Sequence, residues 1–263
     1  MNHALRGTLR GKLGAMSRVL FVGNSLTFWS GGLDNIFRNW GFDAVAETLP
    51  GATLVKHWKA GAARARIREA RWDFVVLQDD LPEYGTRPGG SHDRWWALCE
   101  QFGPVLSKFV DVVKGVDAVP IVYMAHPYAR LSATSLRDIC WAHKFVEQYL
   151  GVAIAPGGLA HKLADGLSLG PLLDDDLEHP SEAGLYLHAL AIAGVCVGRE
   201  GIQGLQWAPS ELPDSRIEVF KKLASDSFDA WSAYEKPPSD DALKTVMDLA
   251  LIGKVKDSDT AVP

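Results

Sequence analysis

A serine placed to act as a nucleophile stands near the start of the chain, in the run Val19-Leu20-Phe21-Val22-Gly23-Asn24-Ser25. The apolar residues predict a buried strand, and the glycine permits a tight turn directly after it. Parallel α/β sheets carry their chemistry at the carboxyl ends of their strands, so Ser25 would lie at such an edge. An ordinary strand-to-helix turn with Ser25 as helix N-cap explains this segment equally well. The choice depends on a second group.

That second group is a histidine with an acidic partner, about 150 residues downstream. In Asp176-Leu177-Glu178-His179-Pro180, the aspartate and the histidine are three residues apart on one predicted loop. An aspartate that accepts the Nδ1–H of a histidine leaves Nε2 to take a proton from a serine hydroxyl. A solvated acidic loop with an incidental histidine is the alternative. Together with Ser25, Asp176 and His179 predict a nucleophilic triad for acyl chemistry.

Five short apolar runs must position these residues, and segments with helical periodicity separate them. The runs are Arg18 to Val22, Ala44 to Thr48, Phe74 to Leu77, Val119 to Met124 and Val152 to Ala155. The long helical segments are Asp93 to Val113, Ser132 to Leu150 and Glu182 to Val197. This alternation predicts an α/β fold with a five-stranded parallel sheet in the flavodoxin-like order 2-1-3-4-5. Ser25 would then lie at the switch point beside the end of the first strand.

The predicted domain organisation is one catalytic domain with two extensions. Residues 1–15 precede the first strand and are expected to form a flexible extension, whereas 16–235 form the domain and 236–263 a polar tail. Within the domain, Pro156 to Asp176 has no clear periodicity and is expected to be irregular. Ser210 to Tyr234 is expected to form a last amphipathic helix.

The composition favours a small-molecule substrate. The net charge is −5 and no dense basic segment occurs, which argues against nucleic acid as the main partner. Three scattered cysteines, Cys99, Cys140 and Cys196, form neither a disulfide framework nor a zinc motif and favour a reducing compartment. No apolar leader precedes Met16 and no run of about 18 apolar residues occurs, so we expect a cytoplasmic protein with no membrane partner.

These motifs resemble the SGNH (GDSL-like) hydrolase family over roughly Ser17 to Gly198. Gly23-Asn24-Ser25-Leu26 corresponds to the family's first block, and Asp176-x-x-His179 to its last. The resemblance implies a three-layer α/β/α domain, an acyl-serine mechanism and no cofactor. It also implies an oxyanion hole made by the Ser25 N–H, the N–H of Gly51 in Leu49-Pro50-Gly51-Ala52, and a side chain after the third strand.

The third block departs from the family pattern. Gly-x-Asn-Asp would fall on Gln78-Asp79-Asp80-Leu81, so Asp80 replaces the oxyanion asparagine. An ionised carboxylate only accepts hydrogen bonds, whereas the amide of Gln78 can donate. Gln78 is therefore the predicted third donor, and a protonated Asp80 is the alternative.

A few other residues are candidates for substrate, metal or nucleophile sites. Trp29 is predicted to wall the substrate pocket or to pack in the core, and His126 to face the same crevice or to serve as a structural turn histidine. Gly166-Leu167-Ser168-Leu169-Gly170 matches a nucleophile elbow, but the preceding segment is helix-like rather than a strand. Asp79, Asp80 and His126 lack a recognised ligand spacing, so no metal is expected.

The predicted function is hydrolysis of small carboxylic esters, with O-acetyl groups on carbohydrates as one substrate class. Ser25 would attack the carbonyl, His179 would accept the proton and Asp176 would orient the imidazole. Two alternatives remain open on the sequence. One is acyl transfer to an alcohol in place of water, and the other is a catalytically weak ligand-binding domain on the same fold.

Overall fold

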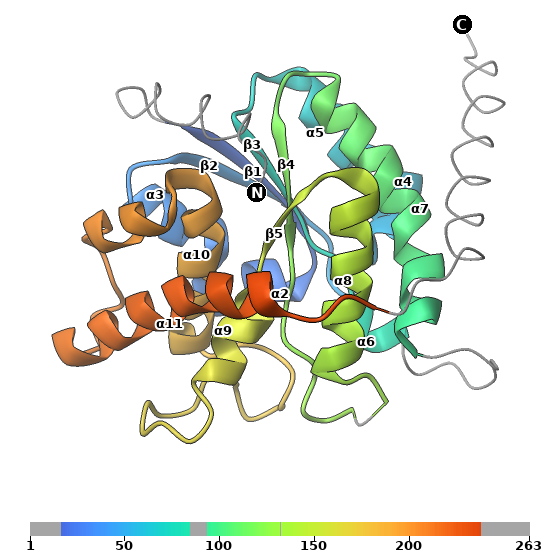
Figure 1. Cartoon of the computed structure of the whole chain (residues 1–263). Coiled ribbons are helices and arrows are strands. Elements are labelled where there is room, and N and C mark those ends of the chain that lie inside the picture. Colours follow the sequence, from blue (N-terminus) through green and yellow to red (C-terminus); the bar gives the residue numbers. More distant parts are fainter. Residues whose placement is uncertain (1–16, 85–93, 132, 238–263) are drawn as a thin grey trace, which may run out of the picture.

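The computed structural model of the protein describes residues 17–84, 94–131 and 133–237, which fold around one parallel sheet (Figure 1). The five strands are β1 (Arg18–Gly23), β2 (Asp43–Thr48), β3 (Phe74–Leu77), β4 (Val119–Tyr123) and β5 (Ala153–Ala155). Every neighbouring pair is parallel, and the strand order is β2-β1-β3-β4-β5. The predicted order 2-1-3-4-5 is confirmed, and β1 lies at the switch point.

Helices cover both faces of this sheet and make the three layers that were predicted. One face carries α3 (Leu33–Asn39), α9 (Gly157–Leu163), α10 (Glu182–Val197) and α11 (Asp214–Ala233). The other carries α4 (Leu54–Ala60), α5 (Ala62–Glu69), α7 (Arg94–Lys114) and α8 (Leu136–Leu150). The remaining helices are the short α2 (Ser25–Phe28), η1 (Trp29–Gly31), α6 (Leu81–Tyr84) and η2 (Arg199–Gly204).

Alternation along the strands divides the core into two apolar clusters, because successive side chains of a strand point to opposite faces. Val19 and Phe21 of β1 pack into the cluster that contains α3 and α10. Leu20 and Val22 pack into the cluster that contains α7 and α8. The uniformly apolar character of the β1 run is thus explained by burial on both faces.

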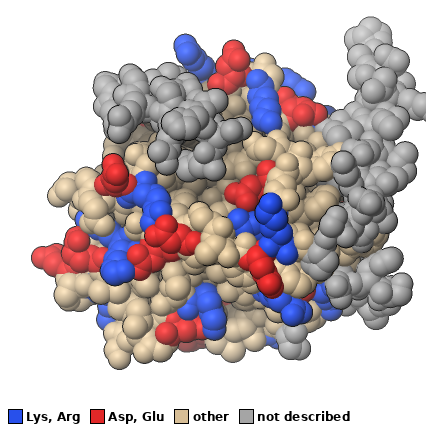
Figure 2. Space-filling view, in the orientation of Figure 1, with Lys and Arg blue, Asp and Glu red and all other residues tan. Residues whose placement is uncertain are grey.

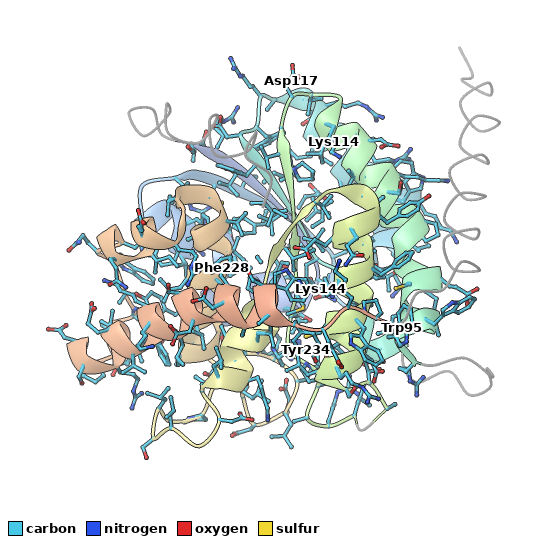
Figure 3. All side chains as sticks on the ribbon, viewed as in Figure 1. Trp95, Lys114, Asp117, Lys144, Phe228 and Tyr234 are labelled. Atoms are coloured by element: carbon cyan, nitrogen blue, oxygen red, sulfur yellow. The ribbon has the colours of Figure 1, made fainter. Side chains whose placement is uncertain are left out.

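The helix α10 lies inside the molecule, which explains its lack of a polar face. Residues 184–196 are all buried, and α3, α9 and α11 pack around them. Gly194 lets α11 approach closely, since a Cβ at this position would lie 2.6 Å from a ring carbon of Phe228 (Figure 3). Helix α11 also contacts α8 of the other layer. Lys144 Nζ of α8, labelled in Figure 3, lies 4.0 Å from the centre of the Trp231 ring of α11.

Several predicted boundaries differ from the structure for local reasons. The helix predicted from Ser132 begins at Leu136, because Ser135 and Asp138 form a reciprocal capping box there. The last helix begins at Asp214 rather than Ser210, directly after Pro213. The expectation that 156–176 is irregular is wrong in its first part, where α9 forms.

Some predicted features lie outside the described residues. They are the extension 1–15, the beginning of the helix predicted from Asp93, and the tail from 238 onward. Among the described helices, none combines the length and the apolar character needed to cross a bilayer. On the face shown in Figure 2, acidic and basic side chains are interspersed and form no single-sign field.

Candidate active site

The turn after β1 presents Ser25 as the first residue of a short helix. Asn24, not Ser25, is the N-cap of α2, and its Oδ1 accepts a hydrogen bond from the Leu26 N–H at 3.0 Å. The alternative in which Ser25 serves as the cap is therefore wrong. The Ser25 side chain does not cap this helix, and the residue is 8% exposed at the carboxyl edge of the sheet.

Two buried side chains hold this turn in place. The Oε1 atom of Gln78 accepts hydrogen bonds from the Asn24 N–H at 2.8 Å and from the Thr27 hydroxyl at 3.2 Å. Its Nε2 donates to the Asp79 carbonyl at 2.8 Å. From α4, His57 Nε2 donates to the Gly23 carbonyl at 2.9 Å. Gln78 was predicted as an oxyanion donor; in the structure its Oε1 braces the nucleophile turn, while its Nε2 donates to the Asp79 carbonyl.

Two backbone N–H groups remain as candidate oxyanion donors. Ser25 begins α2, so its N–H has no acceptor within the helix. Gly51 follows β2 with φ of 54°, and its N–H donates no backbone hydrogen bond in the described part of the chain. The Leu49 N–H donates to the Gly23 carbonyl at 3.1 Å, which fastens the Gly51 turn to the Ser25 turn.

Asp80, the alternative third donor, is buried and bonded to a tyrosine. Its Oδ1 accepts a 2.6 Å hydrogen bond from the Tyr128 hydroxyl. Burial raises the pKa of Asp80, and this effect outweighs the opposing hydrogen bond from Tyr128. A raised pKa moves Asp80 toward the protonated form that could donate.

The loop after Leu173 orients His179 through Asp176. Asp176 Oδ2 accepts the His179 Nδ1–H at 2.6 Å, while Oδ1 accepts the backbone N–H groups of Glu178 and His179, both at 2.9 Å. Despite partial desolvation, these hydrogen bonds lower the pKa of Asp176 to about 2. Leu177 adopts φ of 58°, an uncommon conformation for a non-glycine residue, which lets the loop fold back on the carboxylate.

Contacts from η1 bring the serine and histidine segments together. The Trp29 indole stacks on the His179 imidazole, with 4.0 Å between ring centroids and 16° between planes. Trp29 Nε1 donates to Asp174 Oδ2 at 2.5 Å, and the Ser30 hydroxyl donates to the Pro180 carbonyl at 2.9 Å. Because Ser25 and Trp29 are four residues apart, these contacts bring the nucleophile turn and the Asp176–His179 pair into one region.

The second imidazole nitrogen of His179, Nε2, is available to accept a proton. His179 Nε2 is buried and has no hydrogen-bond partner in the described part of the protein, so it is not bonded to the Ser25 hydroxyl. Such catalytic hydrogen bonds are often long in ligand-free structures and shorten when substrate binds. Glu178 Oε1 lies 3.9 Å from this nitrogen, beyond hydrogen-bonding distance.

Sequence reasoning missed a charged bridge beside the site. Arg130, after β4, donates hydrogen bonds to Glu83 of α6 and to Glu178 of the histidine loop. Its guanidinium lies 5.2 Å from the centre of the Tyr128 ring, whose hydroxyl bonds Asp80. The three segments are far apart in the chain and carry no common motif, so no local signal indicated this bridge.

The remaining predicted residues divide between the surface and the interior. Trp29 is 37% exposed and borders an open pocket of about 390 Å³ that Leu173, Asp174 and Asp176 also line, but Ser25 and His179 are not among the described residues that line it. His126 is buried and donates from Nε2 to the Glu178 carbonyl at 2.8 Å, as a structural histidine would. Ser168 lies in an exposed turn after α9, not between a strand and a helix, so the nucleophile-elbow interpretation is wrong.

Solved structures with the same architecture include proteins of the predicted family. A DUF4886 family protein from Bacteroides uniformis is 15% identical, with a TM-score of 0.64, over 81% of this chain and 94% of its own. The acetylxylan esterase Axe2 from Geobacillus stearothermophilus is 15% identical, with a TM-score of 0.54, over 76% of this chain and 100% of its own. A protein of the G-D-S-L family from Desulfitobacterium hafniense is 17% identical, with a TM-score of 0.52, over 68% and 99%.

The chain has the fold of the SGNH hydrolases. No family model and no curated protein matches the sequence, so the similarity resides in the three-dimensional structure. The fold predicted from the two motifs is confirmed. At 15–17% sequence identity, the likeness to these structures shows a shared fold only. The chemistry must therefore be argued from the residues of the site.

Proposed function

We propose that this protein is a serine hydrolase of small carboxylic esters, with Ser25 as nucleophile, His179 as general base and Asp176 as the residue that orients the base. One observation carries the proposal. The Asp176–His179 pair, with Nε2 of the imidazole free, is stacked on Trp29, four residues after a serine at the carboxyl edge of the switch-point strand. This is the set of groups that acyl-serine chemistry requires.

In the proposed first step, the Ser25 hydroxyl attacks the ester carbonyl and its proton passes to His179 Nε2. The imidazolium is stabilised by Asp176, whose pKa of about 2 keeps it ionised at neutral pH. His179 then donates the proton to the departing alcohol oxygen, which leaves an acyl-serine. Water repeats the attack with His179 again as base, and the carboxylic acid leaves.

The developing negative charge on the carbonyl oxygen would be held by the N–H groups of Ser25 and Gly51. Both donors are fixed on the two turns that the Leu49 to Gly23 hydrogen bond joins. Gln78 supports the oxyanion hole by holding the turn, and the Asp80–Tyr128 pair is the candidate for a further donor on the third block. Donors fixed in this way need little reorganisation as charge develops.

Acetyl esters of carbohydrates are the substrate class we favour. Trp29 is 37% exposed, and the indole face opposite the one stacked on His179 is of the kind on which a sugar ring packs. The acetylxylan esterase with the same fold is consistent with this choice. A short acyl group also suits a nucleophile that is only 8% exposed.

The proposal is tested by labelling the folded protein with a fluorophosphonate and by measuring hydrolysis of p-nitrophenyl acetate. We expect one adduct on Ser25, and a fall of roughly 10⁴–10⁶-fold in kcat for Ser25→Ala and for His179→Ala. Ser168→Ala is the matched control, because it removes the exposed serine of the other nucleophile motif and should leave both signals unchanged.

The competing functions give different results in the same experiment. A folded protein with no adduct and no ester turnover would identify a ligand-binding domain. Formation of an acetylated alcohol at the expense of free acetate, when glycerol or a xylose oligomer is added, would identify an acyltransferase.

A further inference from the structure

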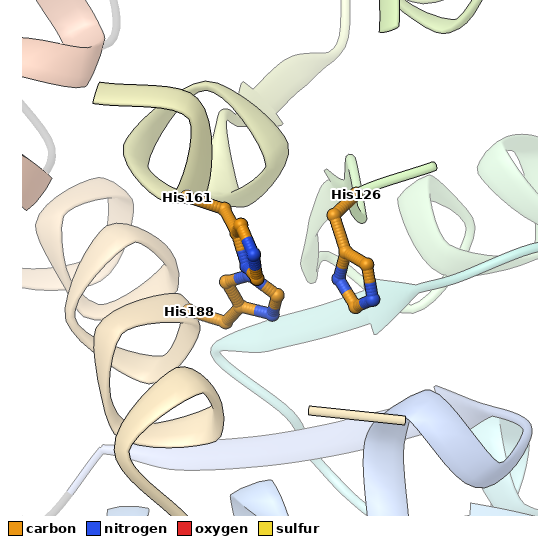
Figure 4. Close-up of side chains that lie close together, drawn as sticks. All are labelled: His126, His161 and His188. Carbon is orange, nitrogen blue, oxygen red and sulfur yellow. The ribbon is translucent and has the colours of Figure 1, made fainter. Parts of the chain in front are cut away.

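Three histidines from separate elements lie close together (Figure 4), and one of them, His126, bonds the Glu178 carbonyl of the loop that carries His179. His126 follows β4, His161 belongs to α9 and His188 to α10. One ring nitrogen from each lies within 4.8 Å of the corresponding atoms of the other two. His126 and His188 are buried and His161 is partly buried. The proposed hydrolysis uses none of these three side chains.

The hydrogen bonds at the outside of the cluster fix which nitrogens face inward. A carbonyl oxygen only accepts, so His126 Nε2 carries the proton that it donates to the Glu178 carbonyl at 2.8 Å. In a neutral imidazole, Nδ1 then holds a lone pair. His126 Nδ1 is buried, has no partner in the described part of the chain, and points toward the other two rings in Figure 4.

The other two rings present matching nitrogens. His188 Nδ1 lies 2.6 Å from the Tyr123 hydroxyl, which leaves its Nε2 facing the cluster. This Nε2 is 3.3 Å from His161 Nδ1. Burial lowers the pKa of His126 to about 3 and that of His161 to about 4, so these imidazoles are neutral at pH 7. Neutral imidazole is the form that binds metal ions.

We propose that His126 Nδ1, His161 Nδ1 and His188 Nε2 bind one divalent transition-metal ion, with Zn²⁺ as the best match. Zn–N distances of about 2.0–2.1 Å in a tetrahedral site place ligand nitrogens about 3.3 Å apart. The His161–His188 pair already has this separation, and His126, whose ligand atom lies within 4.8 Å of the other two, needs to move closer by up to about 1.5 Å. Water would supply the fourth ligand.

The surroundings of the cluster also resemble a metal site. Histidine ligands usually donate their second N–H to a carbonyl or another oxygen, and this fixes the ring orientation. His126 has the Glu178 carbonyl for this purpose, and His188 has the Tyr123 oxygen. The Asp165 carboxylate acts electrostatically on His161 and would offset part of the ion's charge. The ion would connect α9, α10 and the segment after β4 and, through Glu178, support the loop that carries His179.

The test uses the full chain, treated with EDTA and then titrated with Co²⁺ and Zn²⁺. We expect one equivalent of Co²⁺, visible d–d bands typical of tetrahedral coordination, displacement by Zn²⁺, and a rise in the thermal midpoint with Zn²⁺ concentration. Failure of the wild-type protein to bind either ion would overturn the proposal.

Two variants locate the ion. Tyr123→Phe keeps the ring but removes the oxygen next to His188, so we expect affinity to fall roughly 10–100-fold. His161→Gln removes a ligand and should weaken binding further. His143→Gln is the control, because His143 is a buried histidine of α8 that bonds the Ile139 carbonyl instead of the cluster. Equal affinity in the wild type and both cluster variants, or equal loss in the control, would refute the assignment. Circular dichroism confirms that each variant is folded.

Discussion

The substitution Asp176→Asn tests the proposed triad most directly because it retains the shape of the loop. The asparagine oxygen can still accept the backbone N–H groups of Glu178 and His179, which the native Oδ1 bonds at 2.9 Å. The new amide nitrogen replaces Oδ2 and can only donate to His179 Nδ1. This hydrogen bond selects the tautomer with the proton on Nε2, which is the wrong one for a base that must accept a proton from Ser25.

The size of the effect follows from the same geometry. At 2.6 Å and an effective dielectric constant of about 20, Asp176 and a protonated His179 attract each other by about 6 kcal/mol. Because the Asp176 side chain is 42% exposed, solvent reduces this attraction to roughly half. About 3 kcal/mol corresponds to a rate factor of roughly 10². The unfavourable tautomer of His179 accounts for a further factor of roughly 10², so we expect kcat to fall about 10⁴-fold in total.

The assay is steady-state hydrolysis of p-nitrophenyl acetate at pH 7 to 8, with thermal unfolding as the measure of folding. Asp176→Glu is the control that keeps the charge and the preferred tautomer, and its kcat should exceed that of Asp176→Asn. If Asp176→Asn folds like the wild type and retains more than about a tenth of its kcat, the role assigned to Asp176 is wrong.

Three further predictions address the supports of the site. Trp29→Ala removes the ring stacked on His179, so kcat/KM for the same ester should fall roughly 3- to 10-fold, with partial recovery in Trp29→Phe; unchanged kinetics would contradict it. Gln78→Leu leaves the buried Asn24 N–H without its acceptor, so the free energy of unfolding measured in urea should fall by about 1–3 kcal/mol. A decrease below about 0.5 kcal/mol would contradict this role of Gln78. Burial lowers the pKa of His126 and His161 to about 3 and about 4, below the roughly 6.5 of an unfolded chain. The unfolded state therefore binds more protons in this interval, and the thermal midpoint of metal-free protein should fall as pH drops from about 6.5 to 4; a constant midpoint would refute it.

The fold could be predicted from the sequence because its main signals are local. The strands other than β2 are short apolar runs, and the long helices between them carry clear apolar stripes or, as in α10, are apolar throughout. The segment just before Gly166 was predicted to be helix-like, but the beginning of α9 was missed because Gly157 and Gly158 have low helix propensity. In the structure both glycines allow close packing. A Cβ at Gly158 would lie 2.5 Å from the Ala125 carbonyl oxygen, which is a tertiary constraint that composition does not reveal.

The candidate site was predictable only in part, for a similar reason. The pair Asp176 and His179 is three residues apart, so its hydrogen bond is visible as a spacing. The role of Gln78 depends on its neighbour across the sheet, because its Oε1 accepts a hydrogen bond from the Asn24 N–H. His126, His161 and His188 lie in three separate segments with no common motif, so only the folded chain brings them together.

The position of His179 just before the N-cap segment Pro180-Ser181 of α10 has a consequence for motion. Its loop is closed by hydrogen bonds from Asp174 N–H to the His179 carbonyl and from Ser181 N–H to the Leu172 carbonyl, and the helix that follows is interior. The hydrogen-bonded amides of Asp174, Glu178, His179 and Ser181 should therefore exchange with solvent more slowly than the exposed amides of Asp175 and Asp176. The histidine would then stay in place through each turnover, and substrates would be selected by a fixed shape.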